Sequence, residues 1–210
     1  MRRLSCTWFV AAAVIAGHLG LAAAESVRFR HITSVYFDGK GAGLSLPEGV
    51  ACDATGQFVV GDTGNDRLLR FTLRDKAVSD GTEIKIPQLS APSRVRLNSK
   101  GEIYALDSKL RRIVRLGAGG EFKEALSYLG VPDSATVVPK DFTIDAADNL
   151  YVLDVFSARV LVLNPQGQFQ RALPFPEEAG FGSDLAVDST SGSAGLPRSS
   201  STASTHSSRV

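Results

Sequence analysis

The chain has 210 residues, of which 43% are hydrophobic and 21% are charged, the composition of a globular protein rather than of a disordered or fibrous one. Its 23 basic and 22 acidic side chains leave a formal charge of +1, so no overall field favours nucleic acid or an anionic membrane as a partner. A charged partner would have to be recognised locally.

The first segment has the pattern of a secretory signal peptide. Arg2 and Arg3 precede an apolar run that ends in three alanines, Ala22 to Ala24. A charged start, an apolar centre and a small-residue ending are the three parts of a cleavable leader. We therefore expect residues 1–24 to be removed and the mature protein to be periplasmic or extracellular, with no stable membrane insertion after cleavage. An uncleaved anchor is the alternative, because the apolar run approaches spanning length.

Residues 25–43 follow the leader and contain a predicted strand segment, Val27 to Phe37, before the first full repeat. We expect it to form the outer strand or strands of a sheet whose inner strands lie elsewhere.

A unit of about 45 residues then occurs four times. Its copies begin at Pro47, Pro92, Pro139 and Gly182, and the first three continue in the same ungapped register through an aspartate to an arginine. Units of this length cannot bury an apolar core alone and are typical of folds in which repeats stack on their neighbours.

Each unit begins with a predicted hairpin. The third and fifth residues after the start are apolar, an alternation that predicts a strand with one packed face. These pairs are Val50 and Cys52, Val95 and Leu97, Phe142 and Ile144, and Leu185 and Val187. A polar residue ends this strand and leads into a turn that tolerates positive φ. The return strands are 57–61, 102–106 and 149–153.

A third strand and a less regular fourth strand complete each unit. The third strands are 68–73, 113–116 and 160–163, and outer strands are predicted at 82–86, from Gly120 and from Gly167. Four antiparallel strands make one propeller blade, so the predicted fold class is all-β, a β-propeller. The predicted blades are 44–88, 89–135 and 136–180, with the start of a fourth at 181–188.

The units resemble the NHL repeat, the blade of one group of six-bladed β-propellers. That family combines a proline–glycine turn, an apolar strand ending in Asp, a glycine turn, a second strand ending in Asp, and an Asn-x-Arg segment. The first copy follows this pattern from Leu46 to Phe71, whereas the second and third have Leu110 and Ser157 at the Asn position. The resemblance implies four-stranded blades, about three of them complete, in a probable six-bladed ring.

A set of proline and aspartate positions recurs in these copies, and we predict a structural role for it because a turn must recur in every blade whereas a site need not. The set is Pro47, Asp53, Asp62, Pro92, Asp107, Pro139, Asp145 and Asp154. Cys52 shares its position with Leu97 and Ile144, so we expect a small buried hydrophobic side chain rather than a reactive thiol.

The propeller fold hosts scaffolds, receptors, lyases and lactonases alike, so function depends on the site. Our leading hypothesis is a non-catalytic scaffold that binds an unknown protein, peptide or carbohydrate, and not nucleic acid, through loops at one end. The candidate contact residues are Thr63, Asn65, Arg67, Ser108, Arg111, Arg112, Phe156, Ser157 and Arg159. The second unit is also rich in basic residues, which would suit an acidic partner.

The alternative is an enzyme of the lyase or lactonase type with an incomplete metal site. Such sites use His, Glu, Asn or Asp, but the mature histidines, His31 and His206, lie outside the repeats and lack ligand spacing. Serine-nucleophile, phosphate-loop and dinucleotide motifs are absent. No catalytic, metal or cofactor residue is therefore assigned, although an oxygen-only calcium site stays open.

The fourth unit stops after Asp188. Residues 189–210 are rich in Ser and Thr, lack acidic and aromatic residues, and predict a disordered tail. A natural tail and a frameshifted or truncated product, which need not be functional, both stay open. An arc of blades that does not close exposes sheet edges, so self-association is expected.

Overall fold

The computed structural model describes residues 30–175 and 182–187. The chain divides after Ile32 into two compact units, and all strands lie in the second, which begins at Thr33. The predicted leader and tail lie outside the described residues, as does Asp188. No helix in the described part of the chain is long and apolar enough to cross a membrane.

Three four-stranded antiparallel sheets are each built from consecutive strands. The first contains β1 Pro47–Cys52, β2 Gln57–Asp62, β3 Arg67–Arg74 and β4 Ala77–Ile84. The second contains β5 Pro92–Leu97, β6 Ile103–Asp107, β7 Arg112–Leu116 and β8 Phe122–Ala125. The third contains β9 Pro139–Ile144, β10 Leu150–Asp154, β11 Arg159–Leu163 and β12 Phe169–Pro174. The predicted all-β class, with about three four-stranded blades, is confirmed.

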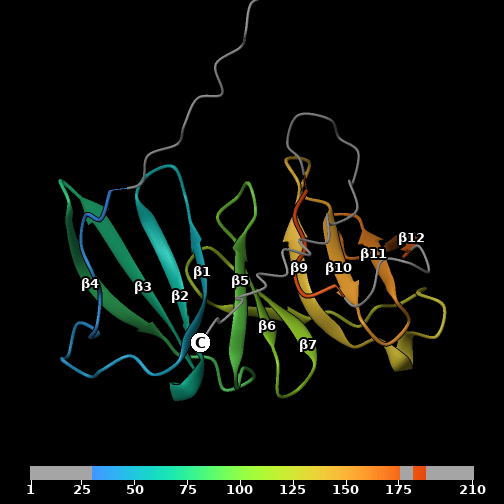
Figure 1. Ribbon diagram of the computed structural model, residues 1–210, viewed down its shortest axis with the longest axis horizontal. Helices are drawn as coiled ribbons and strands as arrows, with labels where there is room; N and C mark the ends of the chain where they lie inside the picture. The colour runs from blue at the N-terminus through green and yellow to red at the C-terminus, as the bar shows by residue number, and fades with distance from the viewer. Residues whose placement is uncertain (1–29, 176–181, 188–210) are drawn as a thin grey trace, which may run out of the picture. The chain divides into compact units, whose positions relative to one another are not determined.

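The first strand of each sheet lies innermost, where neighbouring sheets meet. β1 packs against β5, and β5 against β9, whereas β4, β8 and β12 form the outer edges of their sheets (Figure 1). The antiparallel register joins the start of each inner strand to the end of the next strand, for example Pro47 to Asp62. All turns between second and third strands therefore lie at the same end as the starts of the inner strands.

Alternation within the strands gives each sheet two apolar faces. We call the face toward the preceding sheet the rear face and the face toward the following sheet the front face. Leu68 and Val95 lie in the core between the first and second sheets, and both are fully buried. Ile113 and Phe142 lie in the core between the second and third sheets and are also fully buried. Burying two sheet faces in each seam is the main stabilising contribution in a repeat fold.

Shorter segments cover the two outer faces of the three-sheet stack. The rear face of the first sheet packs against Val35 and Leu44. The front face of the third sheet packs against Leu185 and Val187, the apolar pair of the fourth repeat. Residues 182–187 therefore occupy the place of an inner strand of a following sheet.

The described part of the predicted strand from Val27 to Phe37 is not a regular strand. Residues 30–37 are extended and pair through an isolated bridge between Phe37 and Gly43 rather than through a regular ladder. The outer strand of the first sheet also differs from its prediction. It begins at Ala77, before the predicted 82–86, and contains a bulge opposite Arg70 and Phe71.

The expectation that Cys52 is buried is wrong. The thiol is free and exposed, and Val50 on the same face is 61% exposed. The corresponding Val95 and Phe142 are 0% exposed because a preceding sheet packs on them. Among the described residues no preceding sheet covers β1. The alternation identified the correct face of the strand but not whether that face has a neighbour.

Candidate functional site

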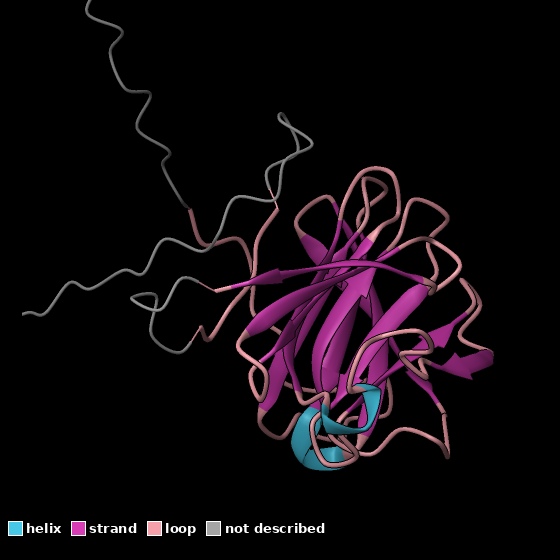
Figure 2. Ribbon diagram, turned by 90° about the vertical axis from the view of Figure 1, so that its right-hand side faces the viewer, coloured by secondary structure: helices cyan, strands magenta, loops and turns pink. Residues whose placement is uncertain are grey.

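The candidate contact residues lie in three equivalent turns, which join the second and third strands of each sheet. The two short 3-10 helices, Thr63–Asn65 in the first of these turns and Ser134–Thr136 before β9, lie at this same end of the sheets (Figure 2). We call this end the turn end.

Each turn begins at a buried carboxylate that binds the loop leading into its own sheet. Asp62 accepts a hydrogen bond from the Ser45 amide at 2.6 Å, and Asp107 accepts one from the Ser90 amide at 2.9 Å. Asp154 accepts one from the Val138 amide at 3.0 Å. All three aspartates are 0% exposed. They connect two segments of backbone and are not available to a ligand.

The arginine at the end of the turn is also used internally in the first and third sheets. Arg67 donates through Nε to Asp62 at 2.8 Å and through Nη1 to Asp38 at 2.7 Å. Burial opposes the charged form of this guanidinium, but the two carboxylates outweigh burial and raise the pKa of Arg67. Arg159 donates in the same way to Asp154 at 2.9 Å.

The second turn departs from this arrangement. Asp107 directs its Oδ1 at the turn amides of Lys109 and Leu110, at 3.1 and 2.9 Å. Arg112 binds the Gln88 carbonyl through Nη2, but its buried Nε has no hydrogen-bond partner. The sequence signal for this difference is Leu110, because Asn65 at the same position in the first turn donates to Asp62 at 2.8 Å.

Several other candidate side chains also form internal contacts. The hydroxyl of Thr63 donates to the Pro92 carbonyl at 2.8 Å, and that of Ser108 to the Ala91 carbonyl at 3.2 Å. Asn65 also donates to the Gly43 carbonyl at 3.0 Å. Ser157 is half-buried in the third turn. Asn65 and Ser108 are exposed, but their polar groups are already used to shape the turns.

Arg111 and Phe156 remain as candidates with exposed side chains, Phe156 being 68% exposed. The structure adds apolar side chains that sequence reasoning missed. Leu46, Leu110 and Leu129 are 73%, 49% and 81% exposed and also lie at the turn end. Exposed side chains of this size in neighbouring loops are the usual mark of an interaction surface. A single-sequence pattern could not mark them, because loop leucines have no periodicity.

The fourth residue after each aspartate is in the left-handed region. Asp66 and Arg111 have φ of 52°, and Ala158 has φ of 48°. Side chains with a Cβ are strained there. A backbone requirement therefore fixes the shape of the turn, while its exposed side chains vary from repeat to repeat.

A group of charged residues joins the inner strands near the turn end. Arg94 on β5 lies 3.9 Å from Glu48 on β1, 3.5 Å from Asp141 on β9 and 3.7 Å from Asp184. Arg96 lies 3.6 Å from Asp141. Asp141 is buried, and its Oδ1 has no hydrogen-bond partner. The group connects all the repeats electrostatically, and its charges largely offset one another.

Asp53 and Asp145 lie at the opposite end, where each closes the first hairpin of its unit. Asp53 accepts hydrogen bonds from the amides of Thr55 and Gln57 at 2.8 and 3.0 Å. Asp145 does the same for Ala147 and Asn149 at 2.9 and 2.8 Å. These contacts lower the pKa of both carboxyl groups, most directly for Asp53 through the Thr55 hydroxyl. Within the described residues no three His, Cys, Asp or Glu side chains are grouped so as to hold a metal.

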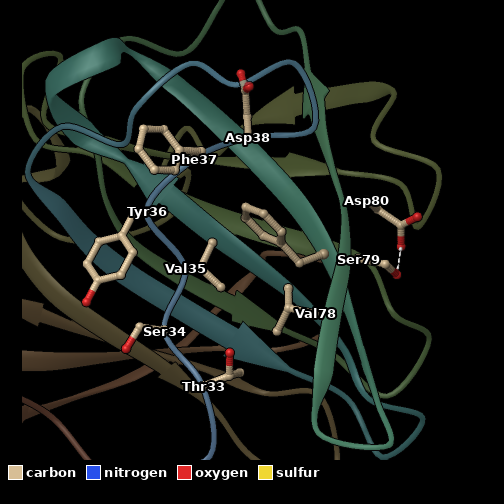
Figure 3. A pocket seen from close by; sticks show the side chains of 10 residues that line it. Thr33, Ser34, Val35, Tyr36, Phe37, Asp38, Val78, Ser79 and Asp80 are labelled. Atoms are coloured by element: carbon tan, nitrogen blue, oxygen red, sulfur yellow. Dashed lines mark hydrogen bonds between the residues drawn. The ribbon is translucent and has the colours of Figure 1, made fainter.

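An open groove of about 290 Å³ lies between residues 33–38 and the outer part of the first sheet (Figure 3). Val35, Phe71 and Val78 form its apolar floor. The nearby carboxylate of Asp38 is already occupied by the amides of Lys40 and Ala42 and by Arg67. The groove is therefore an imperfectly packed contact between residues 33–38 and the first sheet, and its floor is apolar.

No protein-family model matches the sequence, and no curated protein matches it. The chain is similar in structure to several propeller-type proteins. A chain of a nidogen–laminin complex has a TM-score of 0.55 at 22% identity, over 69% of this chain and 54% of that one. A catalytically inactive virginiamycin B lyase from Staphylococcus aureus with quinupristin has a TM-score of 0.52 at 18% identity, over 67% and 45%.

A streptogramin B lyase gives a TM-score of 0.51 at 15% identity, over 73% of this chain and 46% of that one. The chain thus spans about half the length of these structures. At such identities the likeness shows the propeller fold alone, and that fold is shared by a binding complex and by lyases.

Proposed function

We propose that the protein is an exported, NHL-like β-propeller that acts as a non-catalytic binding scaffold, with the turn end as its contact surface. One observation carries this proposal. The polar side chains that recur in the turns form internal hydrogen bonds, whereas the other exposed side chains there include large apolar and basic ones. Leu110 and Phe156 stand on neighbouring turns, with Lys109 and Arg111 beside Leu110.

This combination suits a protein or peptide partner that offers apolar side chains flanked by carboxylates. Exposed leucine and phenylalanine side chains supply buried area on binding, and rim charges supply orientation and association rate. A polysaccharide would use more hydroxyl and amide donors than these turns leave free. Export rests on the leader pattern of residues 1–24 and is part of the same proposal.

The test is affinity capture from the exported fraction of the source cell with three forms of the mature chain. Wild type is compared with a Leu110→Ser, Phe156→Ser double variant and with a Phe122→Ser control, whose side chain is 39% exposed on the outer strand β8. We expect one partner that wild type and control retain and that the double variant loses. Equal capture by all three forms would contradict the proposal.

A metal analysis and a lyase and hydrolase screen on the same preparation address the enzyme alternative. Stoichiometric bound metal together with turnover would contradict the scaffold proposal and support the enzyme alternative. The folded state of each variant is checked by circular dichroism, because all three substitutions are at exposed positions and should leave stability within about 0.5 kcal/mol.

A further inference from the structure

The inner strand of the first sheet exposes an apolar strip on its rear face. Val50 is 61% exposed and Cys52 is exposed, whereas Val95 and Phe142, at the position of Val50 in the next repeats, are 0% exposed. Val35 and Leu44 cover only the part of this face nearer the outer strands. In the other two sheets the preceding sheet covers this position, whereas among the described residues no preceding sheet covers it on β1.

The neighbour that covers this position elsewhere is the inner strand of the preceding repeat. Gly49 lies so close to β5 that a Cβ there would be 2.9 Å from the Val95 amide nitrogen, and Ala51 packs in the same seam. In the last seam, Asp141 of β9 accepts a hydrogen bond from the Leu185 amide at 2.8 Å. Counting from the residue that follows the start of each repeat, the second and fourth residues of one inner strand thus meet the third residue of the next.

Residues 182–187 form an inner-strand segment whose forward side is exposed among the described residues, apart from the contact between Asp184 and Arg94. Leu185 and Val187 pack on the third sheet, and Leu185 is 7% exposed. Asp184 and Ala186, the second and fourth residues after Gly182, are exposed, the Asp184 side chain to 74%. They correspond to Gly49 and Ala51, which contact the next repeat, and Asp184 also corresponds to Asp141.

The backbone of β1 also has a donor for such a contact. The Asp53 amide donates to the Gln57 carbonyl of the neighbouring strand. Because amides alternate in direction along an antiparallel strand, the amide of Val50 points away from β2, toward the inner edge of the sheet. An exposed strand edge with an unpaired amide is a ready pairing site.

We propose that two copies of the chain associate head to tail, with residues 182–187 of one copy lying along β1 of the other. Asp184 accepts a hydrogen bond from the Val50 amide of the second copy, as Asp141 does from Leu185 within one copy. Ala186 covers Val50 and Cys52. We choose a second copy as the partner because residues 182–187 of the chain are the segment that fits along β1. They pack on the third sheet and leave Asp184 and Ala186 exposed for this contact. Such a contact is heterologous, so it forms either a closed ring or an open chain of copies.

Cysteine cross-linking tests this contact directly. In a Cys6→Ser background, Ala186→Cys places a second thiol on the exposed face of residues 182–187. After treatment with a short bis-maleimide, we expect the main cross-link to join Cys52 of one copy to the introduced thiol of another, as identified by peptide mapping. The Cys6→Ser chain without the second substitution is the control and should give little cross-linked product.

Two outcomes overturn the proposal. One is a product joined only through Cys52 to Cys52, which would indicate a symmetric contact between first sheets. The other is a chain that stays monomeric in light scattering across micromolar to millimolar concentrations, with Cys52 equally reactive toward a maleimide throughout.

A charge variant provides a second measurement. Val50→Glu would bury an unpaired carboxylate beside Asp184 and should raise the dissociation constant of the assembly by about tenfold or more. Phe122→Glu, a similar change at an exposed site on β8, should leave it unchanged. Equal association of the two variants would contradict the proposal, and circular dichroism shows that each variant is folded.

Discussion

Each buried carboxylate at the turn end has several donors, and its removal leaves all of them without an acceptor. Asp62 accepts from the Ser45 amide, from Asn65 and from Arg67. Asp62→Ala removes a buried acceptor of the Ser45 amide and one of the two carboxylates that Arg67 contacts, so it should lower the free energy of unfolding by about 3 kcal/mol. Urea denaturation measures the change. Glu48→Ala, at a side chain 51% exposed, is the control and should change stability by less than about 0.5 kcal/mol.

A second buried carboxylate gives the protein an acid-sensitive contact on the second sheet. Burial of Glu102 opposes its ionisation, but hydrogen bonds from Lys123, Arg115 and Asn98 outweigh burial and lower its pKa to about 2. Unfolding restores the ordinary pKa of 4.5. Because the folded pKa is the lower one, ionised Glu102 stabilises the fold fully above about pH 5, and this contribution decreases as the pH falls from 4.5 toward 2.

Acidification from pH 7 to pH 2 lowers the free energy of unfolding of wild type partly through protonation of Glu102. In Glu102→Gln this part is missing, so we expect the decrease to be smaller than in wild type by about 2–3 kcal/mol. Urea denaturation of both proteins at several pH values checks this. Glu124→Gln, which removes a partner of Arg115 that is 48% exposed, should keep the full acid dependence. The same acid dependence in all three proteins would show that Glu102 is not the responsible group.

The sequence indicates a residue's role where a backbone turn imposes it, but not where the role depends on a neighbouring segment. Asp53, Asp107 and Asp145 accept hydrogen bonds from amides of the turn that follows each of them. Asp62 and Asp154 instead accept from an amide of the loop that leads into their sheet. The exposure of Cys52 and the unpaired Nε of Arg112 depend on what lies across a seam or within one turn. Neither the exposure of Cys52 nor the unpaired Nε of Arg112 can be predicted from the sequence pattern.

At the level of elements, each turn between the second and third strands requires a left-handed residue that none of the three repeats supplies as glycine. Ala158 has φ of 48° and an exposed side chain. Glycine has no Cβ to strain there, so Ala158→Gly should stabilise the protein by about 0.5–1 kcal/mol. Thermal unfolding measures the change. Ala147→Gly is the control, because Ala147 itself is not at a positive φ, and this variant should lose stability instead.

Strands were predicted best where apolar alternation is strong. The second and third strands of all sheets lie within about one residue of their predicted ranges. β4 begins five residues early, at Ala77 rather than Thr82, because its polar, partly exposed residues carry no alternation and only pairing with β3 makes them a strand. β8 and β12 are also outer strands with mostly exposed or half-buried residues, so for them the sequence predicted only an approximate start.

At the level of the whole molecule, stability is distributed over seams between sheets. Phe142 is fully buried in the seam between the second and third sheets, and Arg96 lies over its ring at 5.9 Å. Phe142→Ala should cost about 3–5 kcal/mol and weaken this seam in particular.

Hydrogen exchange measured by mass spectrometry shows where the loss falls. We expect residues 139–174 to lose protection before residues 47–84, because each sheet of a repeat fold depends mainly on its nearest neighbours. Uniform loss of protection along the chain would instead indicate one cooperative unit.

The bonds from Asp62, Asp107 and Asp154 to the incoming loop have a consequence for how the chain can be cut. Each carboxylate belongs to one sheet, while the amide it accepts from, in Ser45, Ser90 or Val138, belongs to the loop that arrives before that sheet. A blade excised at the proline therefore loses the backbone that its own aspartate holds. New termini should be tolerated better at the opposite end, in hairpins such as the one around Thr55, where the closing bonds of Asp53 lie within a single sheet.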